Sequence, residues 1–284
     1  MQKRMPSGPT GSDLHSVSEI PEPNRVTTLE MQVKTFIAIL LLTTGTAYAG
    51  GTLTPNLRIT SGVLSYNLQY RVYLPEGYES QEDLAVLYVV DGQSYIKQGG
   101  VPRVLNRLIA SGKIEPVVVV FVDARDPDKL SDNRRNAQFF CNRNYLEFYR
   151  DELIPEIEQQ YPVAQDREKR SVLGLSFGGL NSACFGLFGF DTFAGIGMQS
   201  PAYHPVPKLL SAYEEMPLLP LRIFLSTGKP NDNTQATRKL RDVLKSKGYP
   251  MEYIEVREGH NWSNWKPLID DVLRFFYEVE TEAS

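Results

Sequence analysis

Residues 171–180 constrain the fold of this chain more than any other stretch, because they read Ser-Val-Leu-Gly-Leu-Ser-Phe-Gly-Gly-Leu. An apolar, strand-forming run over 171–173 enters the segment, and a helix of small residues over 179–187 leaves it. Glycines stand two residues before and two residues after Ser176, as the tight strand-to-helix turn of a nucleophile elbow requires. We therefore predict that Ser176 is a nucleophile. The competing interpretation is a glycine-rich turn with an incidental serine.

Strand-forming and helix-forming stretches alternate along the chain. The runs 84–90 and 116–122 are continuously apolar, which is expected of strands covered on both faces. The run 64–74 alternates apolar and polar residues, which predicts a half-exposed antiparallel strand. Further strands are predicted over 171–173, 193–198, 221–225 and 251–256, and helices over 104–109, 145–160, 179–187, 234–246 and 267–278. This alternation predicts an α/β fold with a mostly parallel central sheet, helices on both faces and a ligand site at the carboxyl ends of the strands.

A serine hydroxyl is a weak nucleophile and needs a histidine as general base. The sequence holds three histidines, of which His15 lies in the polar N-terminal stretch. His204 follows the predicted strand 193–198, whereas His260 follows the last predicted strand. The position of His260 matches the chain order in which the base comes last, so we predict that it is the base. His204 is assigned to the wall of the substrate cleft or to the surface.

The carboxylate that orients the base is expected between the serine and the histidine, at the end of a strand. Asp232 lies in the loop after the predicted strand 221–225, and we predict that it is this acid. Its alternative role is the N-cap of the helix 234–246. Glu255 and Glu258 are the other candidate acids, but they stand close to the histidine in sequence.

The oxyanion of an acyl-transfer reaction needs two preorganised donors. The backbone N–H of Phe177, next to the predicted nucleophile, is the first candidate. The second is expected from the loop after an early central strand, where the chain reads Asp91-Gly92-Gln93, so we predict the backbone N–H of Gln93. A plain turn is the alternative interpretation of this loop.

Composition sets limits on partners and cofactors. The 284 residues are 42% hydrophobic, with a net charge of −4 and no basic stripe, which argues against a nucleic-acid partner. We expect one catalytic domain over 50–284 and no metal or organic cofactor, because metal-ligand spacings and glycine-rich phosphate loops are absent from the sequence. The two cysteines are too few for a disulfide framework. Cys184 is expected to pack as a small apolar residue, and a bond to Cys141 stays open for an oxidising compartment.

The N-terminal region predicts export. Residues 1–30 are rich in Pro, Ser, Gly and charge and are expected to be disordered, whereas 31–49 combine a lysine, a short apolar core and an Ala-Tyr-Ala end. This pattern is typical of a signal peptide, and its apolar core is too short for a permanent membrane anchor. We therefore expect translation to start at Met31, a mature chain from about Gly50, and a bacterial periplasmic or secreted protein.

Five motifs spread over residues 55–280 resemble one enzyme family. They are VVDGQ, DELIP, GLSFGG, TGKPNDN and EGHNWSNW. The set is similar to the putative-esterase family of the α/β-hydrolases, which includes enterochelin esterases, feruloyl and acetylxylan esterases, S-formylglutathione hydrolases and mycolyltransferases. The resemblance is closest to the enterochelin-esterase-like branch. It implies an α/β-hydrolase fold and a serine esterase.

The resemblance also suggests residues of the substrate cleft. Trp262 and Trp265 correspond to tryptophans that form the active-site wall in this branch, although packing at a helix start is the alternative. Arg134 and Arg135 are candidates for the arginine contacts near the cleft. The expected function is hydrolysis of a small-molecule carboxylic ester by a Ser-His-Asp acyl-enzyme mechanism, with a siderophore or other bulky polar or aromatic ester as substrate. An acyltransferase on the same triad and an exported binding protein without activity are the alternatives.

Overall fold

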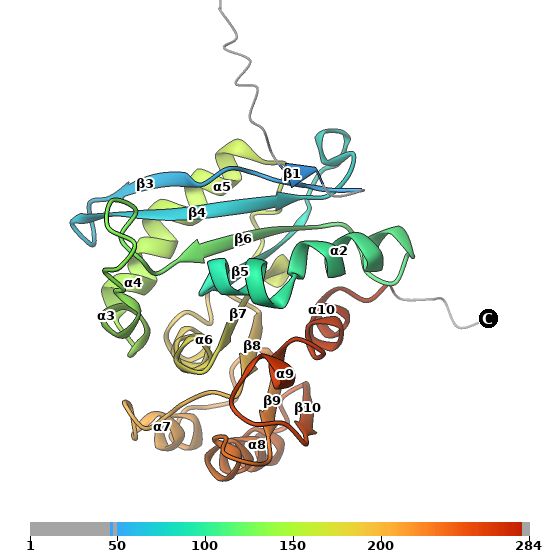
Figure 1. Ribbon diagram of the computed structural model, residues 1–284. Coiled ribbons are helices and arrows are strands. Elements are labelled where there is room, and N and C mark those ends of the chain that lie inside the picture. Colours follow the sequence, from blue (N-terminus) through green and yellow to red (C-terminus); the bar gives the residue numbers. More distant parts are fainter. Residues whose placement is uncertain (1–45, 48–49, 280–284) are drawn as a thin grey trace, which may run out of the picture. The chain divides into compact units, whose positions relative to one another are not determined.

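One central sheet organises the described part of the chain (Figure 1). The computed structural model describes residues 46–47 and 50–279, all of which belong to the compact unit Leu42–Ser284. The expected extension 1–30 and the expected signal peptide 31–49 therefore lie outside the described residues, apart from the pair 46–47. Within these ranges, every helix falls short of the length and apolar character that a membrane crossing needs.

The described residues form a ten-stranded sheet in the order β1-β2-β4-β6-β5-β7-β8-β9-β10, with β3 paired to β4 outside this path. The strands from β6 to β10 along this order are parallel, whereas β4 is antiparallel to β6. The mostly parallel sheet of the sequence-based prediction is confirmed. The strands are β1 Thr46–Ala47, β2 Thr52–Leu53, β3 Leu57–Ser61, β4 Tyr66–Leu74, β5 Ala85–Val90, β6 Val117–Asp123, β7 Arg170–Leu175, β8 Gly195–Gln199, β9 Arg222–Gly228 and β10 Met251–Val256.

Helices cover both faces of the sheet (Figure 1). Side chains of α3 to α8 join the core on one face, and those of α2, α9 and α10 join the core on the other. The α-helices are α1 Gly92–Ser94, α2 Val101–Ala110, α3 Arg135–Phe139, α4 Arg143–Phe148, α5 Ile154–Gln160, α6 Phe177–Phe188, α7 Leu209–Glu215, α8 Thr234–Lys247, α9 Trp262–Trp265 and α10 Ile269–Tyr277. Short 3₁₀ turns lie at η1 Tyr78–Ser80 and η4 Arg167–Lys169, and π-helical turns at η2 Tyr95–Gly99 and η3 Tyr149–Leu153.

The strand β4 is antiparallel as predicted, but the prediction that it is half-exposed is wrong. None of its nine residues is exposed, because both faces are covered and its polar side chains have internal partners. Gln69 donates its side-chain amide to Asp123 on β6 (3.0 Å), and the Tyr73 hydroxyl donates to Asn106 on α2 (2.6 Å). The polar residues that suggested a solvated face therefore serve buried hydrogen bonds.

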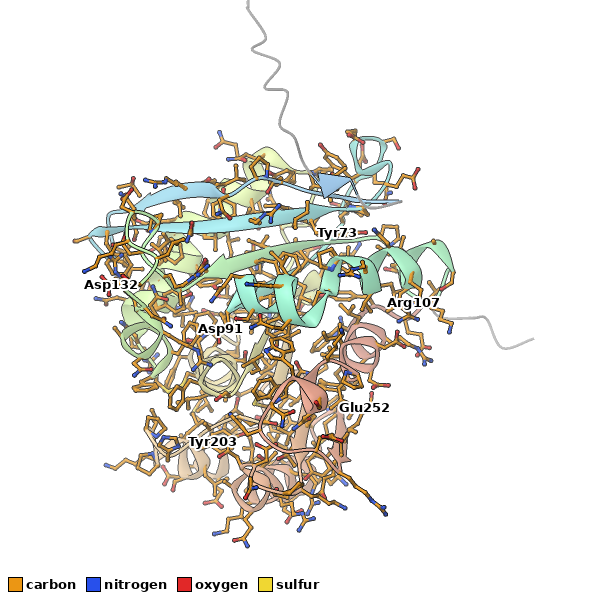
Figure 2. The ribbon with its side chains drawn as sticks, viewed as in Figure 1. Tyr73, Asp91, Arg107, Asp132, Tyr203 and Glu252 are labelled. Atoms are coloured by element: carbon orange, nitrogen blue, oxygen red, sulfur yellow. A yellow bond between two sulfur atoms is a disulfide. The ribbon has the colours of Figure 1, made fainter. Side chains whose placement is uncertain are left out.

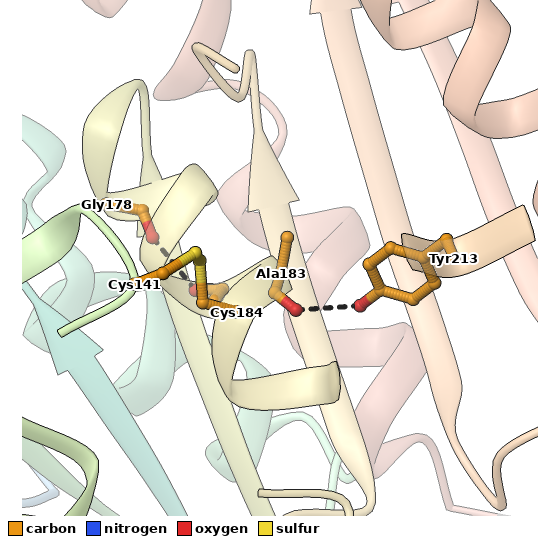
Figure 3. Close-up of a disulfide and its surroundings, with 6 residues drawn as sticks. Cys141, Gly178, Ala183, Cys184 and Tyr213 are labelled. Carbon is orange, nitrogen blue, oxygen red and sulfur yellow. Dashed lines mark hydrogen bonds between the residues drawn. A yellow bond between two sulfur atoms is a disulfide. The ribbon is translucent and has the colours of Figure 1, made fainter. Parts of the chain in front are cut away.

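The two cysteines form a disulfide, which settles the open alternative of the sequence. Cys141 follows α3, Cys184 lies in α6, and their Cα atoms are 5.2 Å apart (Figure 3). In the same close-up, the Tyr213 hydroxyl of α7 donates to the Ala183 carbonyl (2.9 Å). Cys184 is also buried, so it packs in the core as expected while being bonded. The bond ties the segment after β6 to the helix that begins at the nucleophile candidate.

Candidate active site

Ser176 occupies a strained turn between β7 and α6. Its backbone has φ 54° and ψ −118°, a conformation that costs free energy and is found at functional sites. A Cβ on Gly174 would come within 2.2 Å of the Gly178 backbone, so this approach of strand and helix requires a glycine. The Ser176 N–H donates to the Gln199 carbonyl at the end of β8 (2.8 Å). The neighbouring strand therefore holds the turn in place.

The structure brings the three sequence-predicted residues Ser176, His260 and Asp232 together. His260 Nε2 lies 2.8 Å from Ser176 Oγ, and His260 Nδ1 lies 2.6 Å from Asp232 Oδ1. The carboxylate can only accept, so Nδ1 carries the proton and Nε2 is left to accept from the serine. In sequence, Ser176 and His260 are 84 positions apart, and Asp232 and His260 are 28 positions apart. All three residues follow the carboxyl ends of parallel strands.

Both carboxylate oxygens of Asp232 are enclosed by donors, and its side chain is fully buried. Oδ1 accepts from His260 and from the Asn233 N–H (2.7 Å). Oδ2 accepts from the Ser200 hydroxyl (2.6 Å), the Asn264 side-chain amide (2.9 Å) and the Gly228 N–H. Burial alone would raise the pKa of Asp232, but the bonds from His260 and the other donors outweigh it and lower that pKa to about 2.

The structure differs from two alternatives that the sequence left open, Asp232 as an N-cap and Glu255 as the acid. The N-cap residue of α8 is Asn233 rather than Asp232. Glu255 is bonded to Arg238 at both oxygens (2.7 Å each) and to the Tyr253 hydroxyl (2.6 Å). The bonds from Arg238, followed by that from Tyr253, lower the pKa of Glu255 to about 2 although burial opposes them. The side chain of Glu255 is thus engaged elsewhere, and in the described residues the His260 ring is bonded to Asp232.

The two predicted oxyanion donors lie at the starts of helices. Phe177 is the first residue of α6, and Gln93 is the second residue of α1, so neither N–H has an acceptor one turn earlier in its helix. The loop of Gln93 lies against the elbow, because the Asp91 carboxylate is 3.3 Å from where a Cβ on Gly178 would sit. Asp91 has φ 57° and is buried.

Arg135 was predicted as a cleft contact, but it is used inside the protein. Its Nε donates to both oxygens of Asp91 (2.9 and 2.8 Å), and its Nη2 donates to the Leu175 carbonyl just before Ser176 (3.2 Å). Burial raises the pKa of Asp91, and the Arg135 charge opposes this rise. The arginine therefore joins the loop after β5 to the elbow. Figure 2 labels Asp91 at this position.

Arg134 is also engaged in internal contacts instead of facing a substrate. It forms ion pairs with Asp126 and Asp132, the latter labelled in Figure 2, and its guanidinium lies 4.2 Å from the centre of the Tyr66 ring. It also donates to the Asn67 carbonyl (3.2 Å). These contacts fasten the arm 123–134 to β4, and the cleft-contact prediction for Arg134 is replaced by this role.

Trp265 packs against the histidine, and Trp262 packs against Trp265. Trp265 is buried, its indole N–H donates to the Ser200 hydroxyl (2.9 Å), and its ring meets the His260 ring edge-on at 5.0 Å. Trp262 packs edge-on against Trp265 at 5.6 Å and Tyr95 at 5.5 Å. Neither is among the residues that line the cleft beside Ser176, and the ring contacts of both agree with the packing alternative.

A cleft of about 390 Å³ opens beside Ser176. Its lining residues are Ser176, Phe177, Ala202, His204, Asn231, Asp232, Asn233 and His260. The side chain of Phe177 stands between two other rings, with its centre 5.3 Å from that of His204 and 4.9 Å from that of Phe140. His204 therefore lies on the cleft wall, one of the two places expected of it. Two aromatic rings thus line this side of the cleft, with Phe177 half-buried and His204 exposed.

Sequence reasoning missed Gln199, Ser200 and Asn264, which surround the triad. The first two are buried polar residues that directly follow the apolar part of β8, and Asn264 stands between the two tryptophans of α9. The available signal was a polar pair at the carboxyl end of a strand, where functional groups of parallel sheets gather. The sequence did not indicate that the side chains of Ser200 and Asn264 face the acid.

The family model described as "Putative esterase" matches residues 61–276. The chain belongs to this family. Membership of this family supports carboxylic ester hydrolase activity. Sequence relatives of this esterase include "Uncharacterized protein YjcH" of Bacillus subtilis, which is 26% identical over 221 residues covering 74% of this chain and 92% of the relative.

Two further relatives have an activity in their names. The "Endo-1,4-beta-xylanase/feruloyl esterase" of Xylanibacter ruminicola is 27% identical over 73% of this chain and 29% of the relative. The "Iron(III) enterobactin esterase" of Dickeya dadantii is 23% identical over 66% of this chain and 46% of the relative. The esterase thus spans less than half the length of either protein.

Solved structures confirm the α/β-hydrolase fold. A ferulic acid esterase superposes with a TM-score of 0.69 at 22% identity, covering 80% of this chain and 98% of that one. The enterobactin esterase FES from Shigella flexneri superposes with a TM-score of 0.71 at 23% identity, covering 78% of this chain and 58% of that one. At these identities the likeness concerns the fold alone.

Proposed function

We propose that this esterase cleaves its substrate through an acyl-enzyme on Ser176, with His260 as general base and Asp232 as the acid that orients it. The observation that carries the proposal is the continuous chain of contacts from Ser176 Oγ to His260 Nε2 (2.8 Å) and from His260 Nδ1 to Asp232 Oδ1 (2.6 Å). The three residues also follow one another in the chain order typical of this fold.

In the proposed first step, His260 Nε2 takes the proton of Ser176 as Oγ attacks the ester carbonyl carbon. The carbonyl oxygen gains negative charge and accepts from the Phe177 and Gln93 N–H groups. When the intermediate collapses, the C–O bond to the alcohol breaks, and His260 returns the proton to the leaving oxygen. A water molecule then attacks the acyl carbon while His260 takes its proton. The bond from the acyl carbon to Ser176 Oγ breaks, and His260 returns the proton to Oγ, which releases the acid and free Ser176.

Asp232 contributes charge at the moment when the imidazole becomes protonated. Its carboxylate is ionised at neutral pH, because its pKa is about 2 after the hydrogen bonds overcome the effect of burial. The fixed position of Oδ1 also holds the imidazole with Nε2 directed at the serine.

We further propose a bulky ester with an aromatic part as substrate, and a catecholate siderophore ester or a feruloyl ester as the first compounds to test. The rings of Phe177 and His204, which line the cleft beside Ser176, support this substrate class, because aromatic rings pack well edge-on or offset. The names of the enterobactin and feruloyl esterase relatives agree with it.

We infer that the protein works outside the cytoplasm, in the bacterial periplasm or as a secreted enzyme. The Cys141–Cys184 bond supports this inference, because disulfides persist in oxidising compartments. The signal-peptide pattern of residues 31–49 points the same way.

Hydrolysis of short p-nitrophenyl esters by the wild type and Ser176→Ala tests the proposal. We expect the variant to lose at least about a thousandfold in kcat, with an unchanged melting temperature. Unchanged turnover in the folded variant would refute Ser176 as nucleophile. A panel of siderophore, feruloyl, acetyl-sugar and thioester compounds, with alcohols added as competing acceptors, then separates hydrolysis from acyl transfer and ranks substrates.

A further inference from the structure

Ser200 lies directly after β8 in an unusual backbone conformation. Its φ is 46°, in the left-handed region that few serines occupy, and the residue is fully buried. This conformation aims its hydroxyl at Asp232 Oδ2 (2.6 Å). The same hydroxyl oxygen lies 2.9 Å from Trp265 Nε1 and 3.0 Å from Asn264 Nδ2.

The direction of the hydroxyl proton follows from the chemistry of these neighbours. An indole N–H donates and cannot accept. The side-chain nitrogen of Asn264 is identified by its other contacts, the Asp232 carboxylate (2.9 Å) and the Gly259 carbonyl (3.1 Å), both of which can only accept. Among the described residues, the only acceptor bonded to the Ser200 hydroxyl is therefore Asp232 Oδ2. The proton of Ser200 points to the carboxylate.

We propose that Ser200 is a positioning residue for Asp232, with its hydroxyl oriented by the indole N–H of Trp265. The inference rests on the proposed function, because it concerns the acid assigned there. Oδ2 is held by Ser200 and its fellow donors, so the carboxylate cannot rotate and Oδ1 stays directed at His260 Nδ1. A charge-assisted hydrogen bond of this kind is short and strong, and it fixes geometry as well as charge.

The residue before Ser200 supports this role, because the same strand end also holds the nucleophile. The Gln199 carbonyl accepts from the Ser176 N–H (2.8 Å). The Gln199 side chain donates to the Trp265 carbonyl (2.9 Å) and accepts from the Tyr95 hydroxyl (2.9 Å). Two consecutive residues at the end of β8 thus connect the serine, the acid and the helix that follows the histidine.

The test uses Ser200→Ala, which removes the hydroxyl and leaves the backbone and the volume nearly unchanged. We expect kcat for a p-nitrophenyl ester to fall about 10- to 100-fold, the range for losing a hydrogen bond to a charged group. KM is expected to stay within about twofold, because the acid acts when the imidazole becomes charged and not in substrate binding. A residue that only stabilises the fold would lower the melting temperature without this separation of kcat from KM.

Ser226→Ala is the matched control. Ser226 is a buried serine on the adjacent strand β9, and its hydroxyl has no hydrogen-bond partner among the described residues. This variant is expected to keep the wild-type kcat. An equal loss of kcat in Ser226→Ala would overturn the proposal, since the effect would then belong to any buried hydroxyl at this place.

Trp265→Phe tests the orientation of the hydroxyl, because phenylalanine keeps a ring against His260 but has no N–H. It is expected to lower kcat several-fold in the wild type and to add less than about twofold in the Ser200→Ala background, as two steps of one pathway should. Equal losses in both backgrounds would contradict the proposal. If Ser200→Ala does not fold, Trp265→Phe alone decides, with a selective loss of kcat supporting the role and no loss overturning it.

The variant Ser176→Ala separates this inference from the proposed function. An active Ser176→Ala removes the proposed mechanism and the role of Ser200 with it. An inactive Ser176→Ala beside a Ser200→Ala enzyme with wild-type kcat leaves the mechanism standing and overturns the role of Ser200 only.

Discussion

The region around Asp232 (the acid side) and the region around the Phe177 and Gln93 N–H groups (the oxyanion side) are held next to Ser176 by different kinds of contact. On the acid side, the Asp232 side chain is fully buried and receives donors at both oxygens from residues at the ends of β8 and β9, in the loop after β10 and in α9. On the oxyanion side, the loop after β5 and the segment between β6 and α4 are joined to the elbow and α6 by the Asp91–Arg135 ion pair and the Cys141–Cys184 bond.

The two sides should therefore respond differently when one contact is removed. The acid side has several donors for one charge, so losing one of them should disturb orientation while the charge stays solvated by the rest. The oxyanion side is joined by an ion pair and a disulfide between segments distant in sequence, so losing either should destabilise the fold.

Replacing the charge on the acid side should have the largest effect. Asp232→Asn keeps the shape but presents an amide to His260, which favours the wrong tautomer for accepting the serine proton. We expect kcat to fall about 10⁴-fold, equivalent to about 5 kcal/mol, with the fold preserved. Ester hydrolysis and circular dichroism measure the two quantities. A folded Asp232→Asn enzyme within tenfold of the wild type would show that the acid side is not what orients the base.

Removing the disulfide should cost the next largest amount, in stability. The bond closes a loop with a sequence separation of 43 residues. Its loss in a Cys141→Ser/Cys184→Ser variant should lower the free energy of unfolding by about 4 kcal/mol. Urea unfolding with and without reductant measures this, and the double variant serves as control because reductant should not affect it. Identical unfolding of the oxidised wild type and the double variant would remove this link from the comparison.

Breaking the ion pair from one end should cost about 3 kcal/mol of folding free energy. Arg135→Met leaves the Asp91 carboxylate buried without its partner, and that uncompensated charge is the source of the cost. Adding Asp91→Asn removes the charge and should recover most of the lost stability, which makes the double variant the matched control. If the single and double variants unfold at the same urea concentration, the pair does not hold the oxyanion side.

Lowering the pH should have the smallest effect, a loss of folding stability that comes from protonation of Asp232. The folded pKa of Asp232 is about 2, whereas an unfolded aspartate titrates near pH 3.9, so the unfolded state binds the proton first as pH falls. Stability is therefore present above about pH 4 and is lost between about pH 4 and pH 2, by about 2 kcal/mol for this one group. The difference in unfolding free energy between the wild type and Asp232→Asn should shrink over this range. A constant difference would mean that Asp232 is not held in its charged form.

The catalytic residues and the sheet could be predicted from the sequence because they depend on local pattern and chain order. Ser176, Asp232 and His260 each follow a strand in a fixed chain order, and the structure brings them together. The mostly parallel sheet was predictable for the same reason, because alternating strands and helices have few ways to pack. These features depend on local pattern and order.

The features that were wrong or missed depend on three-dimensional neighbours. Arg135 was expected at the substrate because nothing in the sequence indicated its partner Asp91, which stands 44 positions earlier. Trp265 was expected at the cleft, but it is buried and its indole N–H donates to the buried Ser200 hydroxyl. The positive φ of Ser200 itself is a backbone property that its sequence does not reveal.

Covalent labelling tests the central claim most directly. The wild type is incubated with a fluorophosphonate, which reacts with activated serines, and the modified residue is identified by peptide mass spectrometry. We predict a single adduct on Ser176 that forms with the loss of esterase activity, and much slower labelling in Asp232→Asn. An adduct on another residue, or complete loss of activity without modification of Ser176, would contradict the account.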